Sequence, residues 1–149
     1  MKKTAAFLLL PLILLSLFGC SEKIEGELTW YGLEEGIKKA QKEDKMVFVD
    51  NYADWCGWCR KMDENVFSDE DIAKALNEKF VSVKLDVESR DMVVFKGKNY
   101  LPKQLSQSFG VQGLPTFIVL NSKGDVLGDL VGYVPKTRFL KELEKFTEK

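Results

Sequence analysis

Residues 46–60, MVFVDNYADWCGWCR, decide the fold, because an apolar, β-branched segment runs directly into two cysteines spaced C-x-x-C. The predicted strand over 46–52 is apolar at each of residues 46–49, as expected for a central strand that is covered on both faces. A helical pattern follows the cysteines, and a helix N-terminus favours a thiolate through its unpaired N–H groups and its dipole. We therefore predict that this strand delivers a reactive pair, Cys56 and Cys59, to the first turn of a helix.

The rest of the chain supplies alternating helical and strand patterns around this stretch. We predict helices over 33–43, 59–65 and 101–109, one helix that begins after an N-cap at Ser68 and one that begins after Pro135. We predict strands over 46–52, 80–87, 116–120 and 126–131. Trp30 and Tyr31 are expected to pack where the chain joins the domain. Residues 88–103 are charged and irregular, and we expect a loop with at most a short strand or turn. After the first helix, the order β-α-β-α-β-β-α predicts an α/β fold, a three-layer α/β/α sandwich with a mixed central sheet.

Composition narrows the class of function. The chain has 149 residues, of which 45% are apolar and 30% are charged, which is ordinary for one soluble globular domain. The net charge is −1 and no basic run stands out, so nucleic acid is not an expected partner. The chain contains no histidine, which excludes a Ser-His-Asp or Cys-His catalytic pair and any zinc site that uses histidine.

The first twenty residues have the pattern of a targeting segment. Lys2 and Lys3 precede an apolar run over residues 5–18, which is short for a membrane span but typical of a secretory signal. The run ends at Cys20, where the composition turns polar, and this resembles a bacterial lipoprotein signal. We expect a signal peptide over 1–19, lipidation at Cys20, a tether over 20–29 and one domain over 30–149. The alternative is a simple signal peptide or an uncleaved short anchor.

The cysteines then divide into two kinds. If Cys20 carries a lipid, Cys56 and Cys59 are the only thiols of an exported domain. A disulfide across two intervening residues closes a very small loop and constrains the unfolded chain little, so reactivity is the better explanation for the pair. A static disulfide is the plain alternative. A metal site is not expected, because two sulfurs leave a four-ligand shell unfilled.

Asp50 is the third residue of interest in this stretch. It lies six residues before Cys56 on an otherwise apolar strand. Burying a carboxylate is costly unless it has a partner or a function. The alternative is that Asp50 is the exposed end of its strand.

Two separated motifs carry a resemblance to a known family. Residues 55–59, WCGWC, after an apolar strand and residues 113–116, GLPT, before another are similar to the thioredoxin superfamily over most of 30–149. Residues 53–56, 66–69 and 132–133 most resemble the periplasmic C-terminal domain of the DsbD family of thiol:disulfide interchange proteins. They also resemble free-standing thioredoxin-like lipoproteins related to that domain.

The resemblance implies roles for individual residues. Cys56, with the exposed sulfur, would be the attacking thiolate, and the shielded Cys59 would resolve the mixed disulfide. Asp50 would take the proton from Cys59, with Lys84 as its partner, although Lys84 could instead be a surface lysine. Pro115 would be cis and bring the Leu114 backbone beside the dithiol to pair with a client strand, whereas an ordinary trans proline is the alternative.

The residues around the thiols suggest how partners bind. Trp55 and Trp58 would form an apolar landing surface for a client, or would cover the core. The Gly57-Trp58 dipeptide offers no charge or histidine to hold a thiolate, which favours a reductant or a mid-range carrier over a strong oxidant. Two departures from the family stand out: Glu64 replaces a proline that often follows the second cysteine, and residues 88–104 are longer than in minimal thioredoxins.

These expectations combine into a function. The chain resembles an exported, lipid-anchored thiol:disulfide oxidoreductase that reduces disulfides in periplasmic or surface proteins and is regenerated by a membrane electron donor. Apocytochromes awaiting haem and proteins with wrong disulfides are both suitable clients. The protein would act as a monomer, with the Cys56–Cys59 pair as its redox centre and with no cofactor or metal. The rivals are an oxidase or isomerase on the same fold and a non-enzymatic binding or chaperone lipoprotein.

Overall fold

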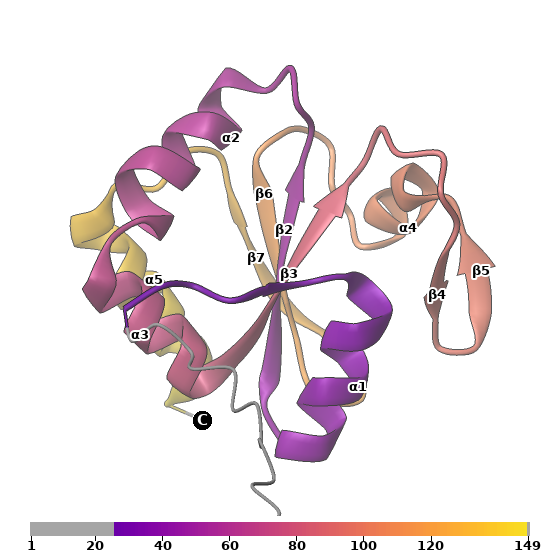
Figure 1. The fold of residues 1–149 in the computed structure, drawn as a ribbon, viewed down its shortest axis with the longest axis horizontal. Coiled ribbons are helices and arrows are strands. Elements are labelled where there is room, and N and C mark those ends of the chain that lie inside the picture. The colour runs from indigo at the N-terminus through magenta and orange to yellow at the C-terminus, as the bar shows by residue number, and fades with distance from the viewer. Residues whose placement is uncertain (1–25, 149) are drawn as a thin grey trace, which may run out of the picture.

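A twisted five-stranded sheet forms the centre of the protein, in the strand order β1-β3-β2-β6-β7 (Figure 1). The computed structural model describes residues 26–148. The predicted signal peptide over 1–19 and the predicted lipidation at Cys20 lie outside the described residues. The strands of the main sheet are β1 (Trp30–Tyr31), β2 (Met46–Tyr52), β3 (Phe80–Asp86), β6 (Thr116–Leu120) and β7 (Val126–Val131).

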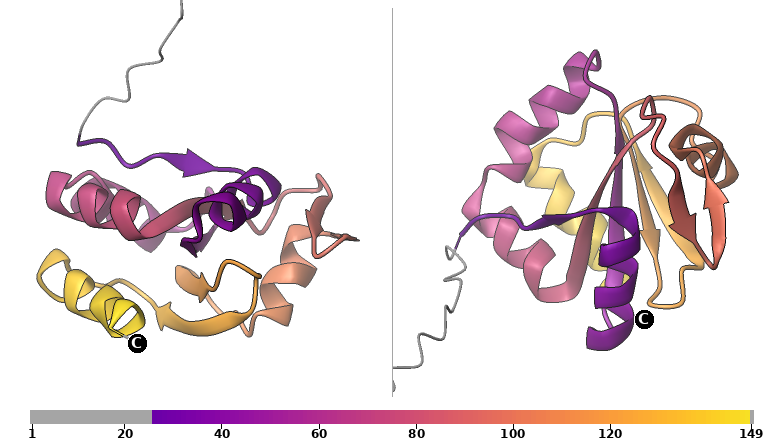
Figure 2. Two further views of the ribbon diagram at one scale, coloured as in Figure 1. Left: turned by 90° about the horizontal axis from the view of Figure 1, so that it is seen from below. Right: turned by 45° about the vertical axis from the view of Figure 1, so that its right-hand side comes forward.

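Helices cover both faces of this sheet, which confirms the predicted α/β/α sandwich (Figures 1 and 2). One face carries α1 and α4, and the other carries α2, a π-helical turn η1, α3 and α5. Their bounds are α1 (Leu33–Glu43), α2 (Gly57–Met62), η1 (Asp63–Phe67), α3 (Glu70–Lys79), α4 (Pro102–Ser108) and α5 (Lys136–Thr147).

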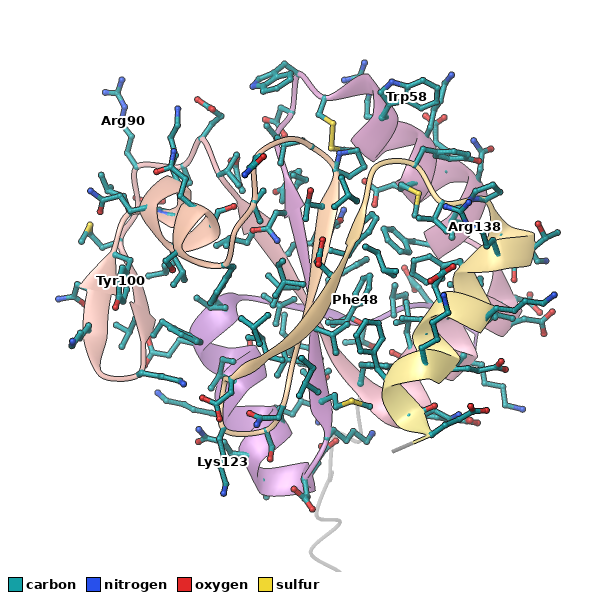
Figure 3. All side chains as sticks on the ribbon, turned by 180° about the vertical axis from the view of Figure 1, so that it is seen from behind. Phe48, Trp58, Arg90, Tyr100, Lys123 and Arg138 are labelled. Carbon is teal, nitrogen blue, oxygen red and sulfur yellow. A yellow bond between two sulfur atoms is a disulfide. The ribbon has the colours of Figure 1, made fainter. Side chains whose placement is uncertain are left out.

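Strand β2 lies in the middle of the sheet, as its apolar run predicts. It pairs parallel with β3 and antiparallel with β6, so the sheet is mixed. Phe48 points to the side of α2, α3 and α5, where its ring packs against four other aromatic rings at centroid distances of 5.4–6.4 Å (Figure 3). Val47 and Val49 point to the opposite face, toward α1 and α4. Such aromatic pairs add about 0.5–1.5 kcal/mol each beyond their area burial.

The sheet register brings two distant loops to the same edge. Asn51, near the end of β2, lies opposite Thr116, the first residue of β6. The chain leaves β2 toward the cysteines at this edge, and it enters β6 from Pro115 at the same edge. The dithiol loop and the proline loop are therefore neighbours, although about sixty residues separate them in the sequence.

The N-terminal part of the domain differs from the expectation. Trp30 and Tyr31 do more than pack against the domain, because they form β1 and pair parallel with β3. Leu28 is already buried, and the Thr29 N–H donates to Asn77 Oδ1 at 3.2 Å. The chain thus joins the fold before Trp30, and a two-residue strand is too short to leave a periodic pattern in the sequence.

The helix after the cysteines is longer than predicted and changes its winding. It begins at Gly57 and continues through the π-helical turn of η1 to Phe67. This turn includes Glu64, the position where related proteins often have proline. The predicted N-cap Ser68 is wrong, because its hydroxyl donates to the Glu64 carbonyl and ends the preceding helix. Asp69 caps α3 instead, its Oδ1 accepting from two backbone N–H groups of the first turn.

The predicted loop over 88–103 contains a β-hairpin of β4 (Val93–Phe95) and β5 (Lys98–Tyr100). Lys96 and Gly97 form its turn with φ angles of 48° and 74°, the left-handed pair that a tight two-residue hairpin needs. Phe95 is buried against Phe109, with ring centroids 5.2 Å apart. This contact fixes the hairpin to α4, beyond the sheet edge in Figure 1. Three-residue strands are too short to be recognised by alternation alone.

Candidate functional site

The two cysteines lie where the sequence places them, at the start of a helix. Cys56 is the N-cap residue of α2, and it is joined to Cys59 by a disulfide with the two Cα atoms 5.3 Å apart. The Cys59 N–H donates to Cys56 Sγ at 3.1 Å. Because this N–H belongs to the first turn, it would also stabilise a thiolate on Cys56 after reduction.

The predicted difference in exposure between the two cysteines is wrong for this disulfide form. Both residues are buried, with 3% of their surface exposed. The disulfide explains this result, because ring closure draws the Cys56 sulfur onto the first turn of α2, against the Cys59 amide. Position at the helix start, and not exposure, is what distinguishes Cys56 here.

Asp50 is a buried carboxylate, so the alternative of an exposed strand end is wrong. Only 1% of its surface is exposed. It lies directly opposite Lys84 in the pairing of β2 with β3, and Lys84 Nζ is 2.7 Å from Asp50 Oδ2. Lys84 is thus the charged partner of Asp50 Oδ2, whereas Oδ1 has no hydrogen-bond partner among the described residues. Burial raises the pKa of Asp50 to about 6, and the charge of Lys84 only partly offsets that effect.

Lys84 also binds a second carboxylate that the sequence reasoning missed. Its Nζ donates to Asp63 Oδ1 at 2.6 Å, and it lies 4.8 Å from the ring centroids of both Trp30 and Tyr52. Burial lowers the pKa of Lys84, but the two carboxylates outweigh burial and the net shift is upward. The charge of Asp63 contributes to the raised pKa of Asp50. Asp63 lies one helical turn after Cys59, and that spacing is the signal that could have revealed it.

The loop before β6 is held at three backbone carbonyls. The peptide bond between Leu114 and Pro115 is cis, as the resemblance implied. Thr116 Oγ1 donates to the carbonyl of residue 113 at 2.8 Å, and the Gly132 N–H donates to the carbonyl of Pro115 at 2.8 Å. Asn51 Nδ2 donates to the Thr116 carbonyl at 3.0 Å. Within residues 26–148, the Leu114 backbone has no hydrogen-bond partner. The loop thus presents the Leu114 backbone with its N–H and carbonyl unpaired inside the described part of the protein.

Asn51 is a second residue that sequence reasoning missed. Its surface is fully buried, and its side chain holds the Thr116 carbonyl next to Pro115. A polar side chain in the apolar run of β2 was the available signal. Like Asp50, it is costly there without a partner.

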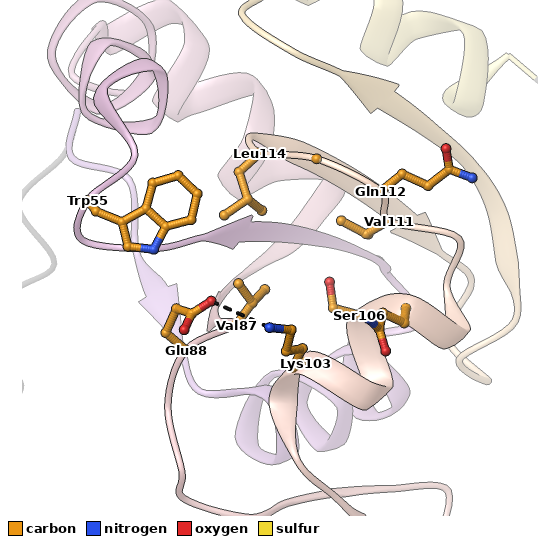
Figure 4. Close-up of a pocket in the computed structure, with 10 residues that line it drawn as sticks. Trp55, Val87, Glu88, Lys103, Ser106, Val111, Gln112 and Leu114 are labelled. Carbon is orange, nitrogen blue, oxygen red and sulfur yellow. Dashed lines mark ion pairs between the residues drawn. The ribbon is translucent and has the colours of Figure 1, made fainter.

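The two tryptophans beside the cysteines are exposed and do not cover the core. Trp55 is 69% exposed and Trp58 is 54% exposed. The Trp58 ring lies 5.6 Å from the Tyr133 ring, and Lys61 Nζ lies 4.4 Å from the Trp58 centroid. Trp55 lines a cavity together with Leu114 (Figure 4). Large exposed aromatic side chains beside a reactive pair suit contact with another protein.

Neither a metal-binding cluster nor a membrane-spanning helix occurs in the part of the chain that the structure describes. That part holds no group of three or more histidine, cysteine or acidic side chains arranged to bind a metal ion. Within residues 26–148, the helices also fall short of the length and apolar character that a membrane span requires.

Comparison with known proteins agrees with this geometry. A family model described as a thioredoxin-like domain matches residues 33–147. The thiol:disulfide interchange protein DsbD of Colwellia psychrerythraea is 36% identical over 95 residues, which are 64% of this chain and 14% of that protein. This chain thus spans about one seventh of that relative's length.

Solved structures show the same fold. A thioredoxin from Thermus thermophilus is 30% identical with a TM-score of 0.68, and the match covers 83% of this chain and 89% of that one. The oxidised C-terminal domain of DsbD from Neisseria meningitidis shares the fold with a TM-score of 0.59 at 24% identity, covering 78% of this chain and 98% of that one. With a C-x-x-C disulfide at the start of α2 and this family match over most of its length, the chain belongs to the thioredoxin-like family of thiol-disulfide oxidoreductases.

Proposed function

We propose that this protein is an exported, lipid-anchored oxidoreductase that reduces disulfides in periplasmic or surface proteins. The observation that carries the proposal is the Cys56–Cys59 pair at the start of α2, next to the unpaired backbone of Leu114. The pattern of residues 1–20 supports export and lipidation at Cys20. The similarity to DsbD supports protein thiols and disulfides as reaction partners, and a membrane protein with a dithiol as the electron donor.

The reaction begins with the reduced protein. The Cys56 thiolate attacks one sulfur of a client disulfide, a mixed disulfide forms, and the other client sulfur leaves as a thiolate. The Cys59 thiolate then attacks the Cys56 sulfur, which releases the second client thiolate. The client gains two electrons, and the protein is left with the Cys56–Cys59 disulfide. A donor dithiol restores the reduced form by the same exchange in reverse.

The buried acid supports the second step. Cys59 reacts as a thiolate, so its proton must go to a base. With a pKa of about 6, Asp50 is mostly ionised at neutral pH and is a suitable acceptor. Lys84 forms ion pairs both with Asp50 on β2 and with Asp63, which lies one turn after Cys59. These two ion pairs connect the Asp50 carboxylate to the helical segment that carries Cys59.

The binding of clients follows from the surface around the pair. An extended client segment would pair with the free Leu114 backbone, as a strand adds to a sheet edge. The exposed Trp55 and Trp58 would contact apolar side chains on either side of the client cysteine. The uncharged Gly57-Trp58 dipeptide supports a reducing role over an oxidising one.

A trapping experiment with insulin tests this function. The Cys59→Ser variant is expected to accumulate a mixed disulfide between Cys56 and an insulin cysteine, because no resolving thiol remains. The wild-type protein should reduce insulin without accumulating the adduct. Mass spectrometry of alkylated digests identifies the linked cysteines. An adduct absent from Cys59→Ser, or present equally in a Cys56→Ser/Cys59→Ser control, would argue against the proposal.

A further inference from the structure

The buried amide of Asn51 joins the two strands that carry the site. Its Nδ2 donates to the Thr116 carbonyl at 3.0 Å and to the Val49 carbonyl at 3.3 Å. Because carbonyl oxygens only accept hydrogen bonds, the nitrogen of the amide must face both of them, which fixes the orientation of the side chain. Val49 belongs to β2, which ends four residues before Cys56, and Thr116 is the first residue of β6 (Figure 1). One side chain thus connects the strand that leads to the dithiol with the strand that begins after Pro115.

Stability alone gives no reason for an amide at this position. Asn51 is fully buried, and its Oδ1 has no hydrogen-bond partner among the described residues. A buried polar atom without a partner is unfavourable, and asparagine is also less suited to a strand than a branched apolar residue. Val47 and Val49 lie on the same face of β2 and show the apolar side chains that this packing accepts. Polar residues that break a local rule in this way are expected where function requires them.

The loop before β6 is held from both neighbouring strands. On the side of β7, the Gly132 N–H donates to the Pro115 carbonyl at 2.8 Å. On the side of β2, Asn51 holds the Thr116 carbonyl. Leu114, whose backbone has no partner in the described part of the chain, comes directly before these two carbonyls. The contact from Asn51 therefore helps to fix where the Leu114 backbone lies with respect to the strand that leads to the dithiol.

We propose that Asn51 is a positioning residue for client binding. Its amide holds the loop before β6 where an extended client segment can pair with the Leu114 backbone while the client disulfide reaches Cys56. The inference rests on the proposed reduction of protein disulfides and adds a residue to it. Because Asn51 is fully buried, it touches neither the client nor the reacting sulfurs, and it acts only through the Thr116 carbonyl. A disulfide without a peptide backbone gains nothing from Leu114, so its reduction should not depend on Asn51.

A comparison of two disulfide substrates tests this role. Insulin offers a peptide backbone beside its disulfides, whereas hydroxyethyl disulfide offers none. The full chain in its reduced form would be mixed with increasing concentrations of each substrate. Rapid alkylation and mass spectrometry would follow the loss of the Cys56 and Cys59 thiols. The dependence of the rate on concentration gives kcat/KM for both substrates, and kcat and KM separately for insulin.

The Asn51→Val variant removes both donated hydrogen bonds and keeps a residue that suits a buried strand. Its kcat/KM for insulin should be about ten-fold below that of the wild type, roughly the effect of one lost hydrogen bond. The loss should appear as a higher KM with kcat unchanged, because the client is bound less well while the sulfur exchange is the same. The kcat/KM for hydroxyethyl disulfide should change by less than about two-fold. Asn51→Ala repeats the test without a branched side chain, so that the result does not depend on how valine packs.

Asn77→Ala is the matched control, because Asn77 also joins two segments through its amide. Its Nδ2 donates to the Glu27 carbonyl at 2.9 Å, and its Oδ1 accepts from the Thr29 N–H at 3.2 Å. These contacts connect the end of α3 to the chain before β1, near the start of β3 and so at the edge of the sheet opposite the dithiol loop. The control should have a lower melting temperature and should keep the wild-type KM for insulin.

The outcomes distinguish the role of Asn51 from the function on which it rests. Equal losses with insulin and hydroxyethyl disulfide would overturn the positioning role, because they would show that Asn51 acts on the dithiol or on the fold as a whole. An unchanged KM for insulin in both Asn51 variants, or the same rise in Asn77→Ala, would also overturn it. All of these results leave the proposed reductase in place. Failure of the wild-type protein to reduce insulin would overturn the proposed function, and the role of Asn51 with it.

Discussion

Replacing Cys56 with serine is expected to lower the rate of insulin reduction by at least about 10³-fold, which is the largest effect on activity that the structure predicts. A hydroxyl in place of the thiol does not form the anion that attacks a disulfide at neutral pH. Cys59 does not replace it, because it lies three residues further along the chain, and its own N–H points back to Cys56 Sγ. Turbidity from precipitating insulin chains, with dithiothreitol as the electron source, measures the loss.

The fold should survive this substitution. The disulfide closes a loop between residues only three apart, so the variant that lacks it should be only slightly less stable than the oxidised wild type. The Cys20→Ser variant is a suitable control, because it removes the third thiol of the chain and should keep full insulin-reductase activity. Retention of full activity by Cys56→Ser, with an unchanged melting temperature, would refute the role of Cys56.

Replacing Asp50 with asparagine is expected to give the largest change in stability. The pKa of Asp50 is raised from 3.8 to about 6 in the fold. The folded protein therefore holds this proton more tightly than the unfolded chain does. The contribution to stability is fully present below about pH 4 and is lost as the pH rises through 6. Asparagine does not titrate, so the variant should gain up to about 3 kcal/mol over the wild type between pH 4 and pH 8.

Urea unfolding of the two proteins at several pH values measures this difference. The comparison of pH slopes removes any constant offset from the lost ion pair. Lys84 should still have a partner in the variant, because its contact with Asp63, at 2.6 Å in the wild type, does not involve the replaced carboxylate. Asp63→Asn is the matched control: it removes the other carboxylate on Lys84, one that is 45% exposed, and should keep most of the slope, because burial is the main cause of the raised pKa of Asp50 and the charge of Asp63 a minor one. Parallel pH profiles for wild type and Asp50→Asn would show that Asp50 does not titrate in this window.

The central part of the fold could be predicted from the sequence because its signals are local. A continuous apolar run marks β2 as a covered strand, and the C-x-x-C spacing that follows marks the start of α2. The resemblance added the pairing of Asp50 with Lys84 and the cis bond before Pro115, both of which the structure contains.

The remaining features depend on contacts between distant segments. Strand β1 exists only because β3 lies beside it, and β4 and β5 are too short to show alternation. Asn51 looks like an ordinary polar residue in the sequence. Its interest comes from the Thr116 carbonyl that it holds, and no local pattern reports that contact.

The reactive residues of the site were predictable from the sequence, whereas the second carboxylate on Lys84 and the burial of Cys56 were not. Asp63 was overlooked because its partner, Lys84, is 21 residues away, and η1 and β3 bring the two side chains together only in the folded protein. The expected exposure of the Cys56 sulfur was wrong because the disulfide state, which sequence does not specify, decides it.

The reduction potential of the Cys56–Cys59 pair tests the proposed reductase most directly. The full chain would be equilibrated with dithiol–disulfide buffers of graded potential, alkylated, and analysed by mass spectrometry for the oxidised and reduced forms of this pair. The account predicts a value near that of thioredoxin, about −270 mV, at which the reduced protein drives client reduction. A value near that of a strong protein oxidant, about −120 mV, would contradict it.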